Sequence, residues 1–257
     1  DHGLRKDSFR QANQLKIKMK NYDINCKILK WRGVKPNSNI QAIARNKRYN
    51  LLKTECSKNK VKLLLLGHHI DDIYENFFIR LLRGSGLKGL ISFYSNETKH
   101  EKDLRILRPL YQIKKKDLDY LASNIFNFSI EDSSNMDMNF KRIRIRKLLK
   151  NLKKEGLDNK KFNLTLTNLS NSEYSINYYV NKNIKSNTIR NKSNNYIINE
   201  DFFQEPFEIV FRSLSVILRQ VSNSYYPPRG KNLQNLINLL NSKKFKKATL
   251  SGCIIEK

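Results

Sequence analysis

Cysteine is scarce in this sequence, with three residues among 257. Cys26, Cys56 and Cys253 are widely separated and form no CxxC pair. The sequence therefore predicts neither a disulfide framework nor a zinc site built from paired thiolates. This cysteine usage is typical of the reducing cytoplasm, where we expect the protein to act.

Long hydrophobic runs are also absent. The apolar stretch 61–66 is short, whereas a membrane-spanning helix needs roughly 20 apolar residues. The first residues show no signal-peptide pattern. We therefore expect no membrane association.

Acidic residues are few, with 23 Asp and Glu against 50 Lys and Arg, which gives a net charge of +27. Such a charge predicts attraction to polyanions, above all nucleic acid, with binding that weakens steeply as salt rises. The chain is broadly rich in Lys, Asn and Ile, so a general compositional bias is an open alternative.

The stretch 61–90 organises the rest of the chain. Residues 61–66 read as a fully buried parallel strand, and four polar side chains follow at once: His68, His69, Asp71 and Asp72. A helical pattern comes next, in which Ile73, Phe77, Ile79, Leu81 and Leu82 can face a sheet. Ligands of open α/β sheets bind just outside the carboxyl ends of the strands, so we expect chemistry at this polar cluster.

Two carboxylates of the cluster share one face of the helix. If Asp71 caps the helix, Asp72 and Glu75 are three residues apart in its first turn, on the side of His68. Such a set can hold Mg²⁺ or act as acid and base. The alternative is that Asp71 and Asp72 only favour the positive end of the helix.

A short glycine loop, Arg83-Gly84-Ser85-Gly86, ends the same helix. Glycines with positive φ can bring backbone N–H groups toward an anion, and Arg83 adds charge. The alternative is that the glycines only terminate the helix.

Hydrophobic periodicity predicts alternating helices and strands in the first half and mainly helices in the second. The expected strands are 24–31, 61–66, 104–107, 196–198 and 249–255, and the expected helices are 7–22, 38–58, 70–82, 114–126, 140–155, a long one from 159, 205–222 and 232–240. The helix 140–155 is the most basic, with Phe140, Ile143, Leu148 and Leu152 as its expected buried stripe. Arg142, Arg144, Arg146 and Lys147 surround that stripe and are candidate phosphate contacts, with a solvated basic face as the alternative.

The sequence GHHIDDIYENFFIRLLRGSGLKGL (67–90) resembles the core motif of the tRNA(Ile)-lysidine synthases, which belong to the N-type ATP-pyrophosphatase (PP-loop) superfamily. DHGLR (1–5), NIQAIARNKRY (39–49), RPL (108–110) and DSSN (132–135) follow the order seen in that family. The resemblance implies a doubly wound parallel α/β sheet of the Rossmann-like kind in residues 1–112, incomplete at its N-terminus, and a mainly α-helical tRNA-recognition region in residues 113–257.

The family's reaction implies the substrates. ATP adenylates the C2 carbonyl oxygen of cytidine 34 in the CAU anticodon of tRNA(Ile) and releases pyrophosphate. The amine of free L-lysine then attacks C2 and displaces AMP. The resemblance implies ATP and Mg²⁺, catalytic roles for His68, Asp72 and Glu75, and metal ligation by Asp72 and Glu75. It places ATP or lysine at Arg45, Arg83, Gly84, Ser85 and Gly86, and tRNA at the basic helix. Residues 132–135 (DSSN) match a DxSN element of the family, which the resemblance implies holds the tRNA or the domain junction. A plain polar turn is the alternative.

One defining element of the superfamily is missing from these residues, the glycine-rich SGGxDS loop that cradles pyrophosphate. The chain also begins at Asp1, inside a motif, so we expect a fragment that is inactive alone. A non-catalytic, basic tRNA-binding protein is the main alternative. A tRNA 2-thiolation enzyme is a second alternative, although it would need paired cysteines. The sequence does not determine the oligomeric state, and a homodimer is left open.

Overall fold

The computed structural model describes all residues except 39, 95–96, 102–103, 129–140, 192–194, 225, 243–244 and 257. The chain forms two compact units, Asp1–Phe162 and Asn163–Lys257. The boundary between them lies later in the chain than residue 112. The division at residue 112 into a nucleotide domain and a tRNA-recognition region concerns function and stays a prediction.

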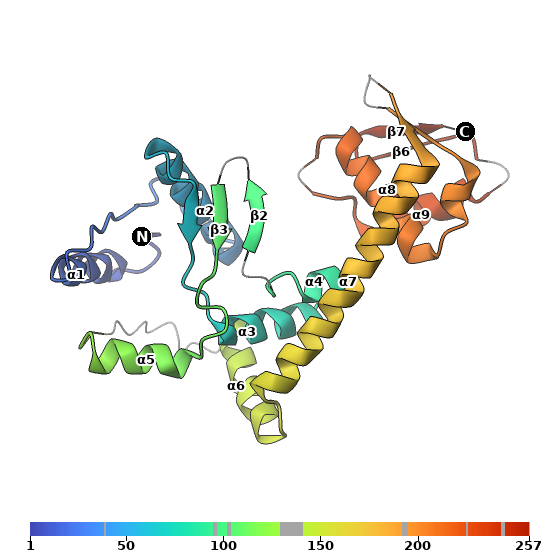
Figure 1. The fold of residues 1–257 in the computed structure, drawn as a ribbon. Coiled ribbons are helices and arrows are strands. Elements are labelled where there is room, and N and C mark those ends of the chain that lie inside the picture. The colour runs from blue at the N-terminus through green and yellow to red at the C-terminus, as the bar shows by residue number, and fades with distance from the viewer. Residues whose placement is uncertain are drawn as a thin grey trace. The chain divides into compact units, whose positions relative to one another are not determined.

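A small three-stranded sheet lies at the centre of the first unit (Figure 1). Strand β1 (Leu63–Leu65) pairs in parallel with β3 (Leu104–Leu107), which pairs on its other side with the antiparallel strand β2 (Glu97–Glu101). The parallel register aligns Leu63 with Arg105 and Leu65 with Leu107. The two parallel strands therefore end at the same edge of the sheet.

Helix α2 (Ile40–Lys58) covers one face of this sheet, where Cys56 packs against Leu104 and Ile106, with Leu64 and Leu66 beside them. Side chains on a strand alternate between its two faces. Leu63 and Leu65 accordingly point the other way and remain 45% and 57% exposed. The prediction of a fully buried strand is thus wrong for this structure, because the described residues bury only one of its faces.

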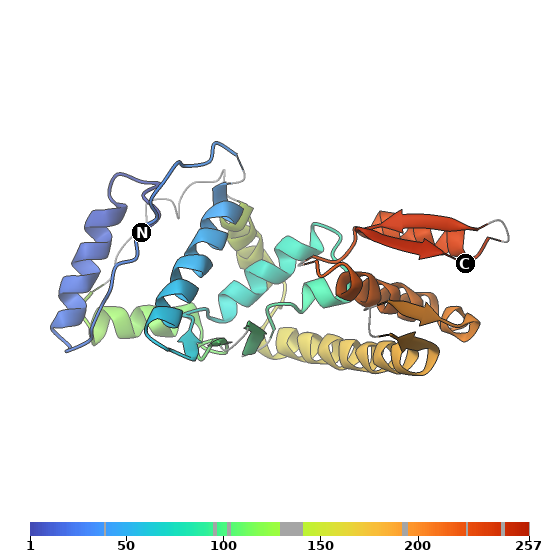
Figure 2. The same cartoon turned by 90° about the horizontal axis from the view of Figure 1, so that it is seen from above.

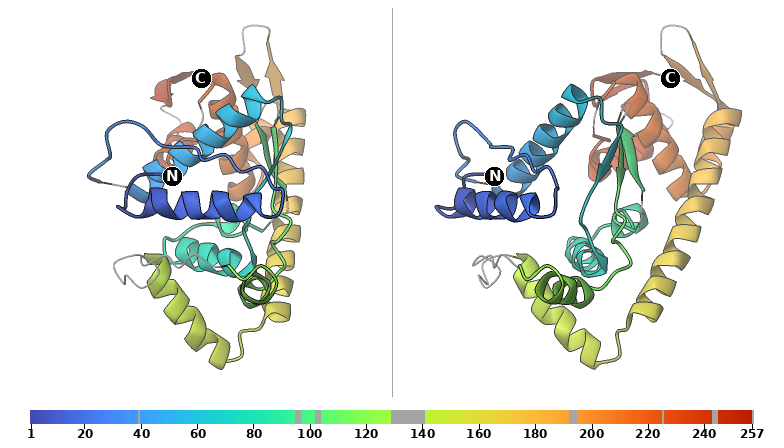
Figure 3. Two further views of the ribbon diagram at one scale, coloured as in Figure 1. Left: turned by 90° about the vertical axis from the view of Figure 1, so that its left-hand side faces the viewer. Right: turned by 60° about the vertical axis from the view of Figure 1, so that its left-hand side comes forward.

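Helix α3 (Ile70–Leu81) follows β1 directly and lies beside α6 (Lys141–Lys154) (Figure 3). It buries Ile70, Ile73 and Tyr74, and the Tyr74 ring stacks on Phe162 with centroids 4.1 Å apart. Leu81 and Leu82 are exposed, contrary to the predicted sheet-facing stripe, because they lie at the end of the helix. The short α4 (Leu87–Leu90) and α5 (Lys115–Asn124) complete this region.

The basic helix α6 has the predicted extent but presents a different stripe. It buries Ile145 and Leu149, whereas the predicted Leu148 is exposed and Ile143 only partly covered. Several apolar rows are possible on a helix this rich in isoleucine and leucine, and contact with α3 selects one of them. Phe140 lies outside the described residues.

Helix α1 (Ser8–Lys20) is confirmed, but the strand predicted at 24–31 is wrong. This segment is extended and pairs with the first residue, since Trp31 N donates to Asp1 O (2.8 Å) and Asp1 N donates to Leu29 O (2.7 Å). An alternating pattern of apolar and polar residues predicts an extended backbone. A β-strand also requires a second strand that pairs with it over several residues, which these two hydrogen bonds to Asp1 do not provide.

The second unit is mainly helical (Figure 2). Its elements are most of α7 (Asn159–Asn187), the hairpin β4 (Thr188–Arg190) and β5 (Tyr196–Ile198), the 3₁₀ helix η2 (Glu200–Phe203), α8 (Phe207–Val221), α9 (Gly230–Leu240), and the hairpin β6 (Lys247–Leu250) and β7 (Cys253–Glu256). Phe202, Leu214 and Leu233 are almost fully buried at its core.

The single strand predicted at 249–255 is wrong, because Ser251 and Gly252 take positive φ (53° and 78°) and turn the chain back on itself. A two-residue turn with both residues at positive φ matches the twist of a hairpin.

The observed fold is α/β, mostly helical, with a small sheet that contains one parallel strand pair. Helix covering of both sheet faces, as in a doubly wound fold, stays a prediction. Within the described ranges, no helix has the length and apolar character needed to cross a membrane.

Candidate functional site

His68 and Arg108 lie at the common edge where β1 and β3 end. The Phe93 ring lies between them: its centroid is 4.8 Å from that of the His68 imidazole, edge to face, and 4.2 Å from the Arg108 guanidinium carbon. Arg108 is 4% exposed and Phe93 is 7% exposed. This edge carries the predicted polar cluster, as expected from the direction of the parallel strands.

His68 is held neutral at this edge. Burial lowers its pKa to about 4, against a smaller opposing effect of Asp72, and the charges of Arg108, Arg45 and Arg142 lower it further. Its buried Nδ1 has no hydrogen-bond partner among the residues that the structure describes. A neutral imidazole with one open nitrogen can accept or donate a hydrogen bond to a ligand at pH 7 without adding charge.

Arg45 links the basic groups of the site. It is on the part of α2 near this edge, where its guanidinium donates to Tyr49 Oη (3.3 Å). Burial is the largest cause that lowers the pKa values of Arg48, Arg80 and Arg108, and the charge of Arg45 lowers all three further. Mutual repulsion among guanidinium groups is relieved when an anion binds between them, so this cluster has the electrostatics of an anion site.

Asp72 organises the start of α3. Its Oδ2 accepts a hydrogen bond from His69 N (3.0 Å) and lies 3.6 Å from His69 Nε2. The N-cap is therefore His69, which corrects the expectation that Asp71 caps this helix.

Asp71 serves the neighbouring helices instead. One oxygen accepts a hydrogen bond from Lys115 N (3.0 Å), at the first residue of α5, and the other binds Lys153 Nζ of α6 (3.1 Å). Burial alone would raise the pKa of Asp71, but these two contacts hold it below its ordinary value. Asp71 thus ties α5 and α6 to α3.

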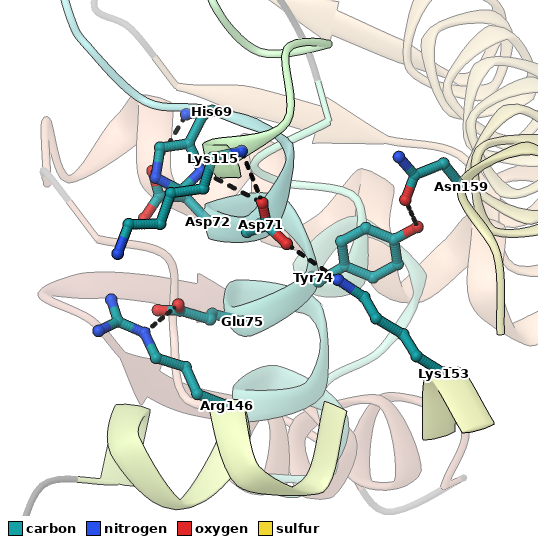
Figure 4. Close-up of polar contacts among 9 residues, drawn as sticks. All are labelled: His69, Asp71, Asp72, Tyr74, Glu75, Lys115, Arg146, Lys153 and Asn159. Carbon is teal, nitrogen blue, oxygen red and sulfur yellow. Dashed lines mark hydrogen bonds and ion pairs between the residues drawn. The ribbon is translucent and has the colours of Figure 1, made fainter. Parts of the chain in front are cut away.

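Glu75 is 2% exposed and its Oε1 accepts a hydrogen bond from Arg146 Nε of α6 (2.5 Å). Within the described part of the chain, its other oxygen is buried without a hydrogen-bond partner. Figure 4 shows that the three carboxylates of α3 point to different partners: Asp72 to His69, Asp71 to Lys115 and Lys153, and Glu75 to Arg146.

The described residues contain no group of three His, Cys, Asp or Glu side chains that could ligate a metal. Magnesium in nucleotide sites is commonly held by one or two carboxylates together with phosphate oxygens and water. Asp72 fits that pattern as a hard oxygen ligand. The metal role predicted for Glu75 stays a prediction, since a guanidinium already occupies its carboxylate.

The glycine loop closes the far end of α3. Ser85 N donates to Arg80 O and Gly84 N to Leu81 O (both 3.0 Å), with Gly84 at φ +69°, which is a Schellman C-cap. Arg83 and Gly86 are exposed. The 12-residue helix is about 18 Å long, so the loop and His68 lie at opposite ends of it. The catalytic candidate His68 and the loop thus lie apart, and the ATP- or lysine-binding role of Arg83, Gly84, Ser85 and Gly86 stays a prediction.

The four basic residues predicted on α6 separate into different surroundings. Arg142 is exposed, and its charge reaches His68 and Arg48. Arg146 is in the ion pair with Glu75, while Arg144 and Lys147 are exposed. The predicted DSSN element (132–135) lies outside the described residues.

Three residues of this arrangement were missed as site residues from the sequence: Phe93, Arg108 and Arg80. Arg108 directly follows β3, as His68 follows β1, so its position after a predicted strand was an available signal. The buried Nε of Arg80 has no hydrogen-bond partner among the described residues. The sequence gave no signal for Arg80, because an arginine in a helix is most often solvated.

A family model described as the PP-loop domain matches residues 1–152. The chain belongs to the PP-loop domain family. It is 34% identical over its whole length to a tRNA(Ile)-lysidine synthase from Orientia tsutsugamushi and 32% identical to one from Wolbachia pipientis wMel, and it covers 59% and 60% of those proteins. The predicted resemblance is confirmed, and the chain spans about 60% of the length of these relatives.

Among solved structures, the chain is similar to the U34-tRNA thiolase NcsA from Methanococcus maripaludis with its 4Fe-4S cluster. The TM-score is 0.47 and the identity 20%, and the match covers 61% of this PP-loop chain and 53% of that protein.

Proposed function

We propose that this chain is part of a tRNA(Ile)-lysidine synthase, which uses ATP to join L-lysine to C2 of cytidine 34 in the CAU anticodon. In this proposal residues 1–112 are its ATP-pyrophosphatase domain and residues 113–257 its tRNA-recognition region. The observation that carries the proposal is the arginine cluster around a neutral His68 at the carboxyl edge of a PP-loop sheet. Support also comes from relatives of that name that match the chain from end to end.

The residues act by binding and orienting in this proposal. Arg45 and Arg108 neutralise phosphate charge, and His68 donates or accepts a hydrogen bond at the nucleotide or the activated carbonyl. Asp72 is the candidate ligand for Mg²⁺, which would supply further charge neutralisation when bound. Glu75 keeps a proposed catalytic role, and Arg83 with Gly84, Ser85 and Gly86 is proposed to bind lysine or part of the nucleotide.

The test measures incorporation of radiolabelled lysine into a tRNA(Ile) transcript with a CAU anticodon, with ATP present or omitted. Because the sequence lacks an SGGxDS loop, we expect no product from the 257-residue chain alone and ATP-dependent product when such a loop precedes Asp1. A transcript with a different anticodon is the matched control. Equal incorporation into both transcripts would contradict the proposal.

A second candidate is a non-catalytic RNA-binding protein, which the net charge of +27 favours. It predicts salt-sensitive tRNA binding without lysine incorporation under any of these conditions. A 2-thiolation enzyme has less support, because Cys26, Cys56 and Cys253 are all free thiols and Cys56 and Cys253 are buried.

A further inference from the structure

A lysine-lined groove of about 1310 Å³ lies in the first unit, between the start of α5, the length of α6 and the start of α7. Eight lysines, one arginine and four carboxylates line it, over an apolar floor that includes Ile143, Leu149 and Leu157. The predicted tRNA contacts only partly overlap with this set, since Arg142 and Arg144 are not among the lining residues.

The carboxylates inside the groove leave most of its positive charge uncompensated. Asp71 is paired with Lys153 and Glu75 with Arg146. Among the described residues, Lys114, Lys116, Lys147, Lys150 and Lys154 have no carboxylate partner, and all five are exposed. A groove with this imbalance is complementary to a chain of regularly spaced negative charges.

Several of the groove lysines occupy positions that are unfavourable for the stability of their helices. Lys114, Lys115 and Lys116 lie at the N-terminal end of α5, and Lys160 lies in the first turn of α7. The N-terminus of a helix carries partial positive charge, which disfavours cations. On α6, Lys147, Lys150 and Lys154 follow spacings of three and four residues and so form one row along the groove.

We propose that this groove binds the phosphate backbone of the RNA substrate, with Lys114 and Lys116 on one side and the row of α6 on the other. The proposal rests on the proposed function for the identity of the RNA as a tRNA. Phosphate contacts by lysine carry no sequence information, so the groove supplies affinity and orientation, and the anticodon is read elsewhere.

The test compares two variants of the full chain that lose the same charge. The groove variant combines Lys114→Gln, Lys116→Gln, Lys150→Gln and Lys154→Gln. The control variant combines Lys16→Gln, Lys20→Gln, Lys182→Gln and Lys231→Gln, at exposed lysines outside the groove. All eight positions are on the surface, and circular dichroism checks that both variants are folded.

Binding of a tRNA transcript is measured by filter retention across salt concentrations, without ATP or lysine. We expect the groove variant to raise Kd by at least about tenfold, and to lower the slope of log K against log salt by about 3, as four lost phosphate contacts require. The control variant should change Kd by less than about threefold. Equal effects of the two variants would overturn the proposal.

Two further outcomes separate the possibilities. Polyglutamate serves as a probe for an acidic protein partner. If the groove variant loses polyglutamate binding while both variants bind tRNA equally, the groove binds an acidic protein and the RNA proposal is overturned. If the groove variant loses tRNA binding but no condition yields lysidine, the groove stands and the proposed function fails. If lysidine forms and the groove variant binds tRNA as tightly as the wild type, the proposed function stands and the groove proposal is overturned.

Discussion

Glu75 and Arg146 form an ion pair that joins the first half of α3 to the middle of α6, with Oε1 2.5 Å from Nε. The glutamate side chain is 3% exposed and the arginine 36%, so the pair is partly shielded from water. A residue predicted for catalysis and a residue predicted for RNA binding thus contact each other and hold two helices together.

Replacing Glu75 by glutamine should lower the free energy of unfolding by about 1–3 kcal/mol, because a charge-assisted hydrogen bond in a buried position is lost. Urea unfolding measures this. Glu155→Gln on an exposed site at the end of α6 is the control and should have little effect. If Glu75→Gln leaves the stability unchanged but abolishes lysine incorporation by the chain preceded by an SGGxDS loop, Glu75 acts in chemistry rather than packing.

His68 should titrate with a pKa of about 4 in the folded chain, well below its ordinary value. Since the unfolded chain binds this proton near pH 6.5, stability from His68 is complete above that pH and is lost as the pH falls toward 4. Unfolding measured from pH 4 to 7 should therefore show a steeper pH dependence in the wild type than in His68→Gln. Parallel curves for the two proteins would contradict the neutral state.

Arg45→Gln should raise the pKa of His68, because one of the cations that depress it is removed. The same change should weaken ATP binding by about tenfold if Arg45 contacts phosphate, the usual effect of a lost charged hydrogen bond. NMR titration of the imidazole and calorimetric nucleotide binding measure the two effects. Lys47→Gln, exposed on the same helix, should leave both unchanged.

Gly84→Ala should destabilise the chain by about 1–2 kcal/mol, since an L-residue is strained at φ +69°. Gly86 has φ −67° and open space around the position of a Cβ, so Gly86→Ala is the matched control and should be nearly neutral. Thermal unfolding of both variants checks this. Equal destabilisation would show that backbone strain is not the role of Gly84.

Asp71→Asn should loosen the attachment of α5 and α6, because it weakens the contacts to Lys115 N and Lys153. The folded-state pKa of Asp71 is lowered, so its contribution is present at neutral pH and is lost as the pH falls through that value. Hydrogen exchange of the α5 and α6 amides measures the loosening. Faster exchange confined to α3 would instead assign Asp71 to capping its own helix.

The sequence alone determined much of this protein. Hydrophobic periodicity located α2, α3, α5, α6 and the helices of the second unit, and the short strand before His68 placed the site at the edge of a sheet. These features depend on local spacing, which a sequence displays directly. The order of its motifs also identified the family, which the matched PP-loop domain confirms.

Only the tertiary structure decided which partner each side chain has. Asp71, Asp72 and Glu75 are similar acids within one helical turn and a half, yet Asp72 binds His69 at the start of its own helix, whereas Asp71 binds α5 and α6 and Glu75 binds α6. The partners of Asp71 and Glu75 come from distant parts of the chain. Residues 24–31 alternate like a strand, but no strand of the described residues pairs with them. The buried face of α6 is likewise selected by its contact with α3. Local pattern fixes an element, whereas burial, ion pairing and the depressed pKa of His68 arise from contacts between elements.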